Sequence, residues 1–531
     1  MSSIVEVRVK DYTYLYESTS YRDECGKPRN RRALVGKVDK ETGLRVYKTD
    51  YLDQLRRSGM DVPSSLKQNY SLGEIMNSVV RSYGAFHLFH SIAESTGLLG
   101  VLKKVLPSSY TEIFTLATYL VTSGEPAMYC EDWIHETECL PCGGMSSQSI
   151  SRLLQGIGEN ERNNFFREWG KLRREREYLA LDITSISSWS ALIDEVEWGY
   201  NRDKENLPQI NLCLLMGQES KLPVFQTIYS GSIRDVKTFQ NTMELAEAIL
   251  GEINDVLYVM DKGFFSTKNV NSMILGKNGG FIIGVPFTTK FAVEHVENEK
   301  SDIDRLDKVI VTGTESVRGV TKHCAWGKGK KVYAHIYFNA IKAAKRRECL
   351  YSHVTTIKEL ALKNHEDPKY QSDFKKYLSI EAPGKNGEGL TISVREDVIA
   401  NELKTVGWMV LLSDRITNAK EALLIYRAKD VVEKGFYRLK NCLDMERLRV
   451  HSSENMQGKV FVGFIALILM SHIHNVMVAK ELYKHMSMQK MINLLNKLKI
   501  QEIGDSKIIF PATKEQEGIF KSFGIKPPSS M

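Results

Sequence analysis

The chain has 531 residues, of which 42% are hydrophobic and 26% are charged. This composition is that of a folded, water-soluble protein and excludes a fibrous or wholly disordered chain, while the length predicts about three or four structural units. The net charge of +7 is modest for this length, so the total charge alone does not indicate a nucleic-acid partner.

The N-terminal residues alternate apolar and charged side chains and lack the continuous apolar run of a secretory signal. The longest apolar run, residues 460–470, is interrupted by Gly463 and is much shorter than the roughly 20 residues that a membrane-spanning helix needs. We therefore expect a buried helix there, no membrane partner and a cytoplasmic protein.

The eight cysteines are too sparse and too irregularly spaced for a disulfide scaffold, which favours a reducing compartment. One local group, Cys130, His135, Cys139 and Cys142, contains four potential zinc ligands. It has only one Cys-x-x-Cys pair, whereas zinc ribbons usually have two. Ordinary partly buried thiols are the simpler interpretation, and a zinc site is the alternative.

Basic residues gather in three segments, each able to lie along a phosphate backbone. They are residues 27–32 with Lys27, Arg29, Arg31 and Arg32, residues 171–176, and residues 322–347. One such segment is usually just a solvated face, and three together favour a DNA partner only mildly.

The N-terminal third predicts a β-rich unit followed by a helical region. Residues 1–65 begin with the alternating pattern of strands and contain a turn at residues 41–43. Residues 66–176 have mainly helical spacing, as in residues 146–157, where a hydroxyl-rich start precedes apolar residues. This helical region is interpreted as a DNA-binding or linker region, although helix bundles with other roles have the same pattern.

The centre of the chain, residues 177–285, contains five short apolar or β-branched runs. They span residues 178–186, 210–216, 222–229, 256–260 and 281–285, with helical spacing at 236–250 and 266–275. The order is β-β-β-α-β-α-β, which is that of a ribonuclease H-like core. An α/β fold is therefore expected.

Residues 286–405 interrupt this core with a segment rich in Lys, Gly and Thr, which contains one clear strand at residues 332–338. The core resumes over residues 406–480. A strand is expected at residues 407–413, followed by one long helix from Asn418 to about Leu443. Residues 481–531 form a C-terminal tail.

Two aspartates lie in or at the end of predicted strands. Asp182 is inside the run 178–186, where a carboxylate is costly unless its charge is compensated. Asp261 closes the run 256–260, and sites are built at the carboxyl ends of parallel strands. Carboxylates without an obligatory Arg partner suit Mg²⁺ or Mn²⁺. The alternatives are a hydrogen-bonded structural aspartate for Asp182 and a turn or helix N-cap for Asp261.

The third carboxylate follows from helical geometry. At about 100° per residue, Tyr426, Lys429, Glu433 and Lys440 fall within an arc of about 60°. Beside them runs an apolar stripe that would seat the helix on the sheet and aim Glu433 at the aspartates. The stripe consists of Ile425, Val432, Phe436, Leu439 and Leu443. The alternative is a surface helix in which Lys429 and Glu433 form an i,i+4 ion pair.

Three segments, LALDITSIS, LYVMDKGFFS and YRAKDVVEKGFYRLK, resemble the catalytic blocks of DDE transposases of bacterial insertion sequences, in the branch with a Tyr-Arg-Glu-Lys signature. The signature is present with its spacing intact as Tyr426, Lys429, Glu433 and Lys440. Lys429 replaces the arginine and lacks its bidentate fork, although Arg427 is close by.

The resemblance covers nearly the whole chain, because the stretch KPRNRRALVGKVDKETG and the tail FPATKEQEGIFKSFGIKPP also look like members of this family. The interval from Asp261 to Glu433 is more than twice that between the two aspartates. In the family such an interval accommodates a β-rich insertion domain.

The resemblance implies that Asp182, Asp261 and Glu433 bind two Mg²⁺ or Mn²⁺ ions per active site. It implies phosphate or DNA contacts for a further set of side chains. These are Tyr426, Lys429, Lys440, Arg427 and Trp408, the last stacking on a flipped base if it is not a core residue.

The implied function is that of a bacterial DNA transposase that binds double-stranded DNA, both element terminal inverted repeats and target, as a homodimer associated with the nucleoid. Two alternatives remain. A metal-dependent nuclease on the same core would cut without joining, and a catalytically inactive derivative would only bind DNA.

Overall fold

The computed structural model describes residues 2–10, 12–23, 26–38, 45–57, 76–173, 178–250, 256–275, 280–327, 329–381, 391–504 and 506–529. The chain divides into two compact units. The small unit comprises Met1–Arg81, Lys499–Pro511 and Ser529–Met531, and the large unit comprises Ser82–Leu498 and Ala512–Pro528. The finer division expected from the sequence stays a prediction.

The small unit contains a four-stranded antiparallel sheet, as the alternating N-terminal pattern predicts. Its strands, in spatial order, are β1 (Ser2–Val9), β2 (Tyr12–Arg22), β3 (Pro28–Val38) and β4 (Arg45–Tyr47), followed by helix α1 (Thr49–Arg57). Leu15, Val35, Tyr47 and Leu52 form its apolar cluster. The turn expected at residues 41–43 lies outside the described residues.

A three-stranded sheet was not expected from the sequence. It has the order β18-β17-β5, with β5 (Val79–Ser82) paired to β17 (Lys499–Ile503) and β17 to β18 (Ser506–Ile509). Strand β5 falls in the stretch predicted to be helical. Its β-branched Val79 and Val80 suit a strand. Its partner strand lies near the other end of the chain, so the pairing cannot be predicted from the spacing of nearby residues.

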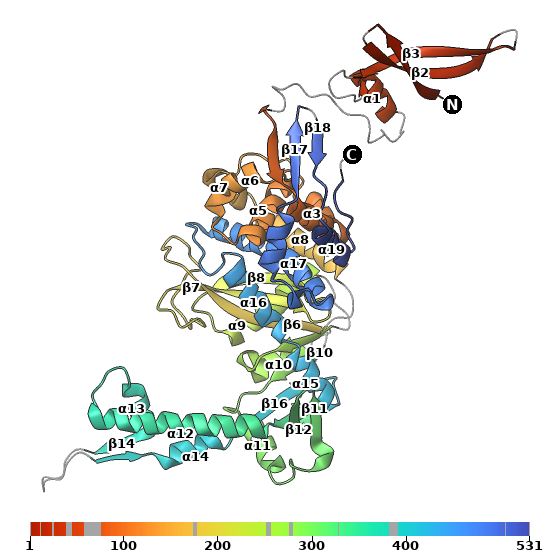
Figure 1. Ribbon diagram of the computed structural model, residues 1–531. Helices are drawn as coiled ribbons and strands as arrows, with labels where there is room; N and C mark the ends of the chain where they lie inside the picture. The colour runs from red at the N-terminus through yellow and green to blue at the C-terminus, as the bar shows by residue number, and fades with distance from the viewer. Residues whose placement is uncertain are drawn as a thin grey trace. The chain divides into compact units, whose positions relative to one another are not determined.

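The large unit is a mixed α/β structure built on a nine-stranded sheet (Figure 1). The predicted order β-β-β-α-β-α-β is confirmed by seven elements, interrupted only by a short 3₁₀ helix (Lys262–Phe264) between the fourth strand and the second helix. They are β6 (Tyr178–Ser187), β7 (Gln209–Gly217), β8 (Pro223–Ser230), α9 (Asp235–Leu250), β9 (Leu257–Met260), α10 (Thr267–Leu275) and β10 (Gly280–Gly284). Strand β6 is antiparallel to β7 and parallel to β9, which is parallel to β10.

The insertion extends this same sheet. Beyond β10 the pairing becomes antiparallel, through β16 (Trp408–Ser413), β13 (Lys330–Phe338), β12 (Glu315–Trp326) and β11 (Val309–Thr312). The strands expected at residues 332–338 and 407–413 are therefore confirmed. Of the remaining insertion elements, α11 (Lys290–Glu299) packs on the sheet and the others form an arm that projects from it (Figure 1). The arm consists of α12 (Ala340–Lys363), α13 (Gln371–Tyr377), β14 (Leu378–Glu381), β15 (Thr391–Val394) and α14 (Glu396–Leu403).

The expectation of a β-rich insertion is wrong, because its longest element is the helix α12. Only a narrow stripe of α12 is buried, consisting of Leu350, Val354, Ile357 and Ala361. The exposed remainder is rich in Lys and Arg, so the stripe is inconspicuous in the sequence. The spacing of four, three and four residues and the N-cap Asn339, whose side chain accepts from the Lys342 N–H, were the available signals.

The predicted helical region is confirmed by α3 (Gly84–Ser95), α4 (Leu98–Val105), α5 (Tyr110–Ser123), α6 (Cys130–Glu136), α7 (Ser147–Gln155) and α8 (Glu159–Leu172). Helix α17 (Ser453–Ala479), which contains the apolar run 460–470, packs on α3, α5, α7 and β8. Among the described residues it alone has the length and hydropathy of a membrane span, and 78% of that window is buried inside the protein. The expected buried helix is confirmed.

The single long helix expected from Asn418 to Leu443 is wrong. Two helices, α15 (Ala419–Arg427) and α16 (Asp430–Cys442), are separated by a turn at Ala428 and Lys429. Asn418 does cap the first helix, accepting from the N–H groups of Lys420 and Glu421. Hydrogen bonds of the i→i+3 type tighten the turn, as from the Val432 N–H to the Lys429 carbonyl. The turn keeps near-helical dihedrals, so the predicted apolar stripe remains buried across the break.

Candidate active site

Asp182 and Asp261 lie side by side on neighbouring parallel strands. In the register of β6 and β9, Leu181 pairs with Met260, so the next residue of each chain segment is one of the two aspartates. The Asp182 side chain is 20% exposed and accepts a hydrogen bond from the Ile183 N–H over 2.9 Å. Asp261 stands at the N-cap of a short 3₁₀ helix but makes no side-chain capping bond there. Its carboxylate is instead turned to another partner.

That partner is Tyr426, the first residue of the C-terminal signature. The Tyr426 hydroxyl donates to Asp261 Oδ1 over 2.9 Å. Tyr426 is held there because α15 packs on β9 and β10, with Ile425 buried in a cluster that includes Val259 and Ile282. The packing of an apolar helix face therefore positions the hydroxyl on the end of β9.

Lys429 connects the other two carboxylates. Its buried ammonium lies 3.0 Å from Glu433 Oε1 and 3.7 Å from Asp182 Oδ2. The i,i+4 ion pair considered from the sequence is therefore present, but on a buried lysine that also reaches the sheet. Asp182 and Glu433 share one cation.

The electrostatics of this cluster are set by burial and by the excess of acidic groups. Burial, reinforced by the charge of Asp261, raises the pKa of Asp182 to about 6 against the opposing effects of Lys429 and the Ile183 N–H. Burial and then Asp261, Asp182 and Glu433 hold the pKa of the Tyr426 hydroxyl far above its ordinary value. Burial would lower the pKa of Lys429, but Asp182 and Glu433 raise it above the usual range. All three carboxylates thus act on the same hydroxyl and the same ammonium.

The donor set fits a hard divalent cation, although no three His, Cys, Asp or Glu side chains among the described residues converge closely enough to hold one. Three carboxylates are oxygen donors of the kind that Mg²⁺ and Mn²⁺ prefer. The raised pKa of Asp182 indicates that one ammonium does not compensate its buried charge fully. Additional positive charge at this place would be stabilised.

The four potential zinc ligands do not converge either. Within the described residues, Cys130, His135, Cys139 and Cys142 form no group that could hold a metal ion. A hydrogen bond between the paired thiols lowers the pKa of Cys142 to about 7 and raises that of Cys139. Their interaction is with each other.

A cleft of 1440 Å³ opens on the cluster within the large unit. Its lining includes four residues of the cluster, Asp261, Tyr426, Lys429 and Glu433. Asp182 does not line the cleft but is ion-paired with Lys429, which does. Further lining comes from the insertion and carries charges of both signs. The cations are Lys342 and Arg346 on α12 and Lys404 after α14, and the carboxylates are those of Glu297 and Glu402. The basic segment 322–347 noted in the sequence therefore contributes to the cleft.

Trp408 and Arg427 also line this cleft. The Trp408 ring is half-buried and packs on Phe338 with ring centroids 4.9 Å apart. Arg427 donates to Thr312 Oγ1 over 2.6 Å and pairs with Glu315 over 2.7 Å, which fixes α15 to the insertion strands.

Lys440 is not brought to the cleft. Its ammonium pairs with Asp203, in the loop between β6 and β7, over 2.5 Å. Sequence reasoning also missed Arg202 in that loop, whose charge lowers the pKa of Asp182. No local motif marks Arg202, since its position depends on an ion pair with Asp235 at the start of α9.

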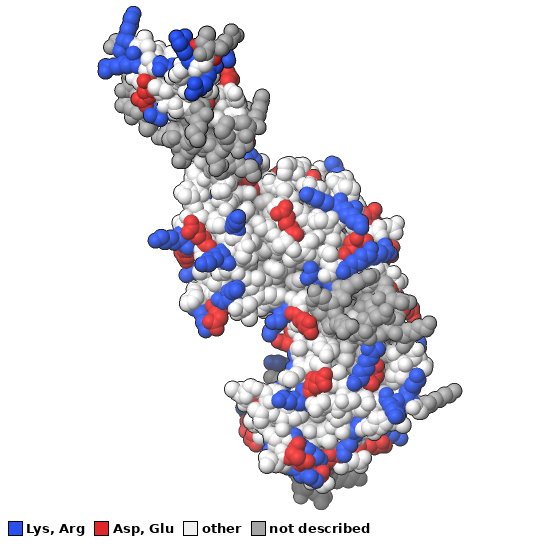
Figure 2. Space-filling model, turned by 90° about the vertical axis from the view of Figure 1, so that its right-hand side faces the viewer, with Lys and Arg blue, Asp and Glu red and all other residues white. Residues whose placement is uncertain are grey.

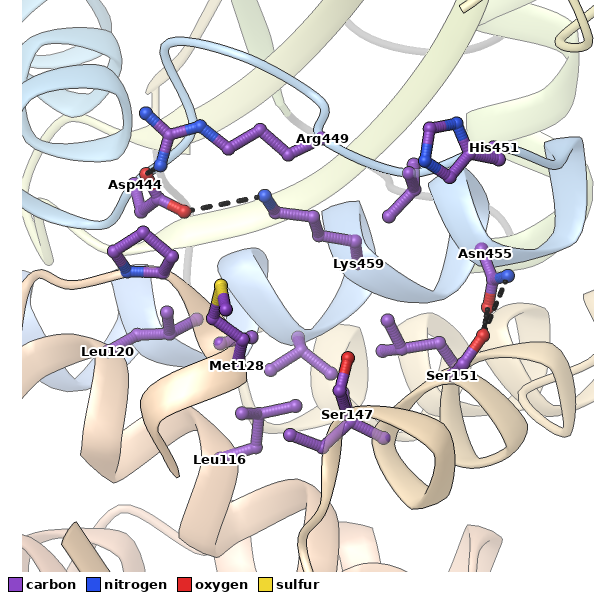
Figure 3. A pocket seen from close by; sticks show the side chains of 16 residues that line it. Leu116, Leu120, Met128, Ser147, Ser151, Asp444, Arg449, His451, Asn455 and Lys459 are labelled. Atoms are coloured by element: carbon purple, nitrogen blue, oxygen red, sulfur yellow. Dashed lines mark hydrogen bonds and ion pairs between the residues drawn. The ribbon is translucent and has the colours of Figure 1, made fainter. Parts of the chain in front are cut away.

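A separate cavity of 370 Å³ lies among α5, α7, α17 and the segment after α16 (Figure 3). Leu116, Leu120 and Met128 form an apolar wall. Facing it, Lys459 Nζ lies 3.6 Å from Asp444 Oδ2, an oxygen with no hydrogen-bond partner in the described structure. None of the residues predicted for the catalytic site lines this cavity.

Charge is distributed differently on the two units. Figure 2 shows Lys and Arg gathered on the small unit, whereas both signs are interspersed over the visible face of the large unit. Lys27, Arg29, Arg31 and Arg32 are exposed in or beside β3. Residues 174–176 of the second basic segment lie outside the described residues.

Residues 173–469 match the family model described as "Transposase DDE domain". The match includes Asp182, Asp261 and Glu433. No curated protein matches the chain. A solved cryo-EM structure of a piggyBac transposase synaptic complex with hairpin DNA is similar at 13% sequence identity and a TM-score of 0.33, over 84% of this chain and 74% of that chain.

Proposed function

Because this chain belongs to the transposase DDE domain family, we propose that Asp182, Asp261 and Glu433 form the centre at which it cuts and joins DNA. The protein is a DNA transposase, and the assignment of these residues is supported chiefly by one observation. Two residues of the spaced signature, Tyr426 and Lys429, are bonded or ion-paired to all three carboxylates.

The strand order supports a ribonuclease H-like core. Strands β8, β7, β6, β9 and β10 follow one another in the sheet, the first three antiparallel and the last three parallel. This arrangement puts the carboxyl end of β9, where sites are built in such sheets, beside Asp182 in the middle of β6. Residues 406–480 complete the proposed core by bringing Glu433 on α16.

The proposed cofactor is a pair of Mg²⁺ or Mn²⁺ ions held by the three carboxylates. When bound, the metal supplies a nucleophile at neutral pH and stabilises the leaving oxygen in an in-line displacement at phosphorus. The chain's own residues orient the carboxylates. Tyr426 fixes Asp261, and Lys429 holds Asp182 and Glu433. A phosphate would compete for the ammonium of Lys429, and a metal ion would compete for the two carboxylates.

The proposed substrate path is the cleft. Lys342, Arg346, Lys404 and Arg427 would neutralise the phosphate backbone, and Trp408 would stack on a flipped base. Lys440 would contact phosphate only after leaving Asp203. The helical region and the Arg-rich strand β3 are proposed to bind the element ends, with the chain acting as a homodimer in the bacterial cytoplasm.

The test uses the full-length chain and a labelled duplex carrying the inverted repeat that flanks its gene. With Mg²⁺ the transposase should give both cleaved and joined strands, and Glu433→Gln should give neither while still binding the duplex. The control is Glu421→Gln, because Glu421 is exposed on α15 and does not line the cleft.

Two outcomes would favour the alternatives. Cleaved strands without joined product would indicate a nuclease. Binding without any cleavage, unchanged by Glu433→Gln, would indicate an inactive DNA-binding derivative.

A further inference from the structure

A second hollow, of 420 Å³, lies in the large unit beside the turn that follows Asp261. Gly263 of that turn lines it, together with residues from the loop between β6 and β7 and from the start of α9. That loop begins after Ser187, five residues beyond Asp182 on β6, and its Arg202 acts electrostatically on Asp182. The hollow therefore borders the proposed catalytic centre without containing any residue of the signature.

The loop backbone at this hollow is held tightly. Glu197 and Gln209 exchange both backbone hydrogen bonds over 3.0 Å. A Cβ added to Gly231 would lie 2.1 Å from the Gln209 carbonyl oxygen, and one added to Gly199 would lie 2.0 Å from the Gly231 carbonyl oxygen. Such close backbone approach is possible only with glycine. The segment is a fixed platform.

Two aromatic rings project from this platform. Trp198 is 62% exposed and Tyr200 is 80% exposed. The Tyr200 carbonyl is anchored by the Gln209 side chain over 2.8 Å, so the exposure of its ring is not due to a loose backbone. An aromatic ring that is held rigidly in solvent contributes little to folding stability. Stacking of the ring on a nucleic-acid base would remove its exposed surface from water and stabilise the complex.

The hollow also has a rigid floor and positively charged side chains. Asn211, which lines it, is only 3% exposed. Its Nδ2 donates to the carbonyls of Ser230, Gly231 and Ile233, which fixes the segment that follows β8 beneath the hollow. Arg202 and Arg234 line the same hollow, and Arg202 is paired with Asp235, the one carboxylate among the lining residues.

We propose that this hollow binds one unpaired nucleotide of the DNA strand next to the cleaved phosphate. The base stacks on Tyr200, with Trp198 as a neighbouring surface. The adjoining phosphate lies against Arg234 and Arg202. This inference rests on the proposed function, because it places the nucleotide beside the turn of Asp261.

The test measures DNA binding without catalysis, in the full-length Glu433→Gln background and without Mg²⁺. Two end duplexes are compared, one fully paired and one with unpaired nucleotides at the cleavage position. The parent should prefer the second duplex. Tyr200→Ala should reduce this preference by about fivefold to 100-fold, the effect of losing one base stack, while Tyr200→Phe should retain it.

The matched control is Tyr129→Ala, since Tyr129 is an exposed tyrosine of the large unit that lines neither the cleft nor the hollow. Arg234→Ala provides a second variant, which should lower the number of ions released on binding the unpaired duplex by about one. A folded Tyr200→Ala variant with the parent's preference would overturn the proposal. Because no cleavage is measured, this result is independent of whether the chain cuts and joins DNA.

Discussion

The Tyr426 hydroxyl donates to Asp261 Oδ1 over 2.9 Å, which ties the helix bearing the signature to the end of strand β9. The two residues are separated in sequence by the whole insertion, yet one hydrogen bond sets the orientation of the carboxylate. Lys429, three residues further on, makes the corresponding connection to Asp182. The turn between α15 and α16 includes this lysine. The residue at which the helix is interrupted is therefore also the one whose side chain contacts Asp182 on the sheet.

Tyr426→Phe should slow DNA cleavage by about 10- to 100-fold at saturating Mg²⁺. A hydrogen bond to a charged group contributes roughly 1.5–3 kcal/mol, and its loss frees the Asp261 carboxylate to rotate. The retained ring should keep the thermal unfolding midpoint close to that of the parent. Tyr178→Phe is the control, because Tyr178 packs against the same apolar cluster. If both variants cleave like the parent, the bond has only a structural role.

The core strands were predictable because each is a short apolar run whose burial is continuous, as in β7 and β10. The pairing of β5 with β17 was not, since neither strand carries information about a partner at the far end of the chain. The insertion strands β11 and β12 were also missed. Apolar and polar residues alternate irregularly in these strands, and many of their side chains are partly exposed, because the strands lie at the outer edge of the sheet.

The site was predictable to the extent that it follows from spacing. The separation of Tyr426, Lys429 and Glu433 by nearly whole helical turns places them on one face even across the helix break. Lys440 fulfils the same spacing but pairs with Asp203, because a loop from the sheet covers that part of α16. Arg202 and the hollow beside Asp261 arise from loop packing at Gly199 and Gly231, which no periodicity reveals.

Lys429→Met should destabilise the metal-free protein at neutral pH by about 2 kcal/mol. The buried Asp182 would lose its compensating charge, while the exposed Glu433 would lose less. Lys429→Arg, which restores the arginine of the family signature, should unfold like the parent. Urea unfolding with and without Mg²⁺ measures both. Mg²⁺ should stabilise Lys429→Met more than the parent, because the metal replaces the missing positive charge. If Mg²⁺ raised the unfolding free energy of Lys429→Met and of the parent by the same amount, the proposed metal position would be contradicted.

The stabilising effect of Mg²⁺ should disappear as the pH falls through about 6, the pKa of Asp182. The pKa of this carboxyl in the folded protein is raised above its ordinary 3.8, so its protonated form contributes stability at low pH. That contribution is lost as the pH rises through about 6. Metal binding needs the ionised form and recovers the loss only above this pH.

Thermal unfolding from pH 4.5 to about 8.5, with and without Mg²⁺, measures this effect. Asp182→Asn is the control. Without Mg²⁺ and above pH 6, this variant avoids the cost of burying a charged carboxylate but loses the pairing with Lys429, so its stability should be close to that of the parent. Mg²⁺ should change the unfolding midpoint of the variant little at any pH. A parent protein that Mg²⁺ stabilises equally at both ends of the range would show that Asp182 is not a ligand.

Lys459→Met should raise the unfolding free energy at neutral pH by about 1 kcal/mol without affecting DNA cleavage. Lys459 lies at the cavity of Figure 3, where burial lowers the pKa of its ammonium more than Asp444 raises it. Asp444 keeps a closer partner in Arg449, at 2.6 Å. Because the pKa of Lys459 is below its usual 10.5 when the protein is folded, the parent should regain stability relative to the variant as the pH rises toward 10.5. Urea unfolding at neutral and alkaline pH measures the difference, and a variant less stable than the parent at neutral pH would mean that the pair with Asp444 outweighs the cost of burial.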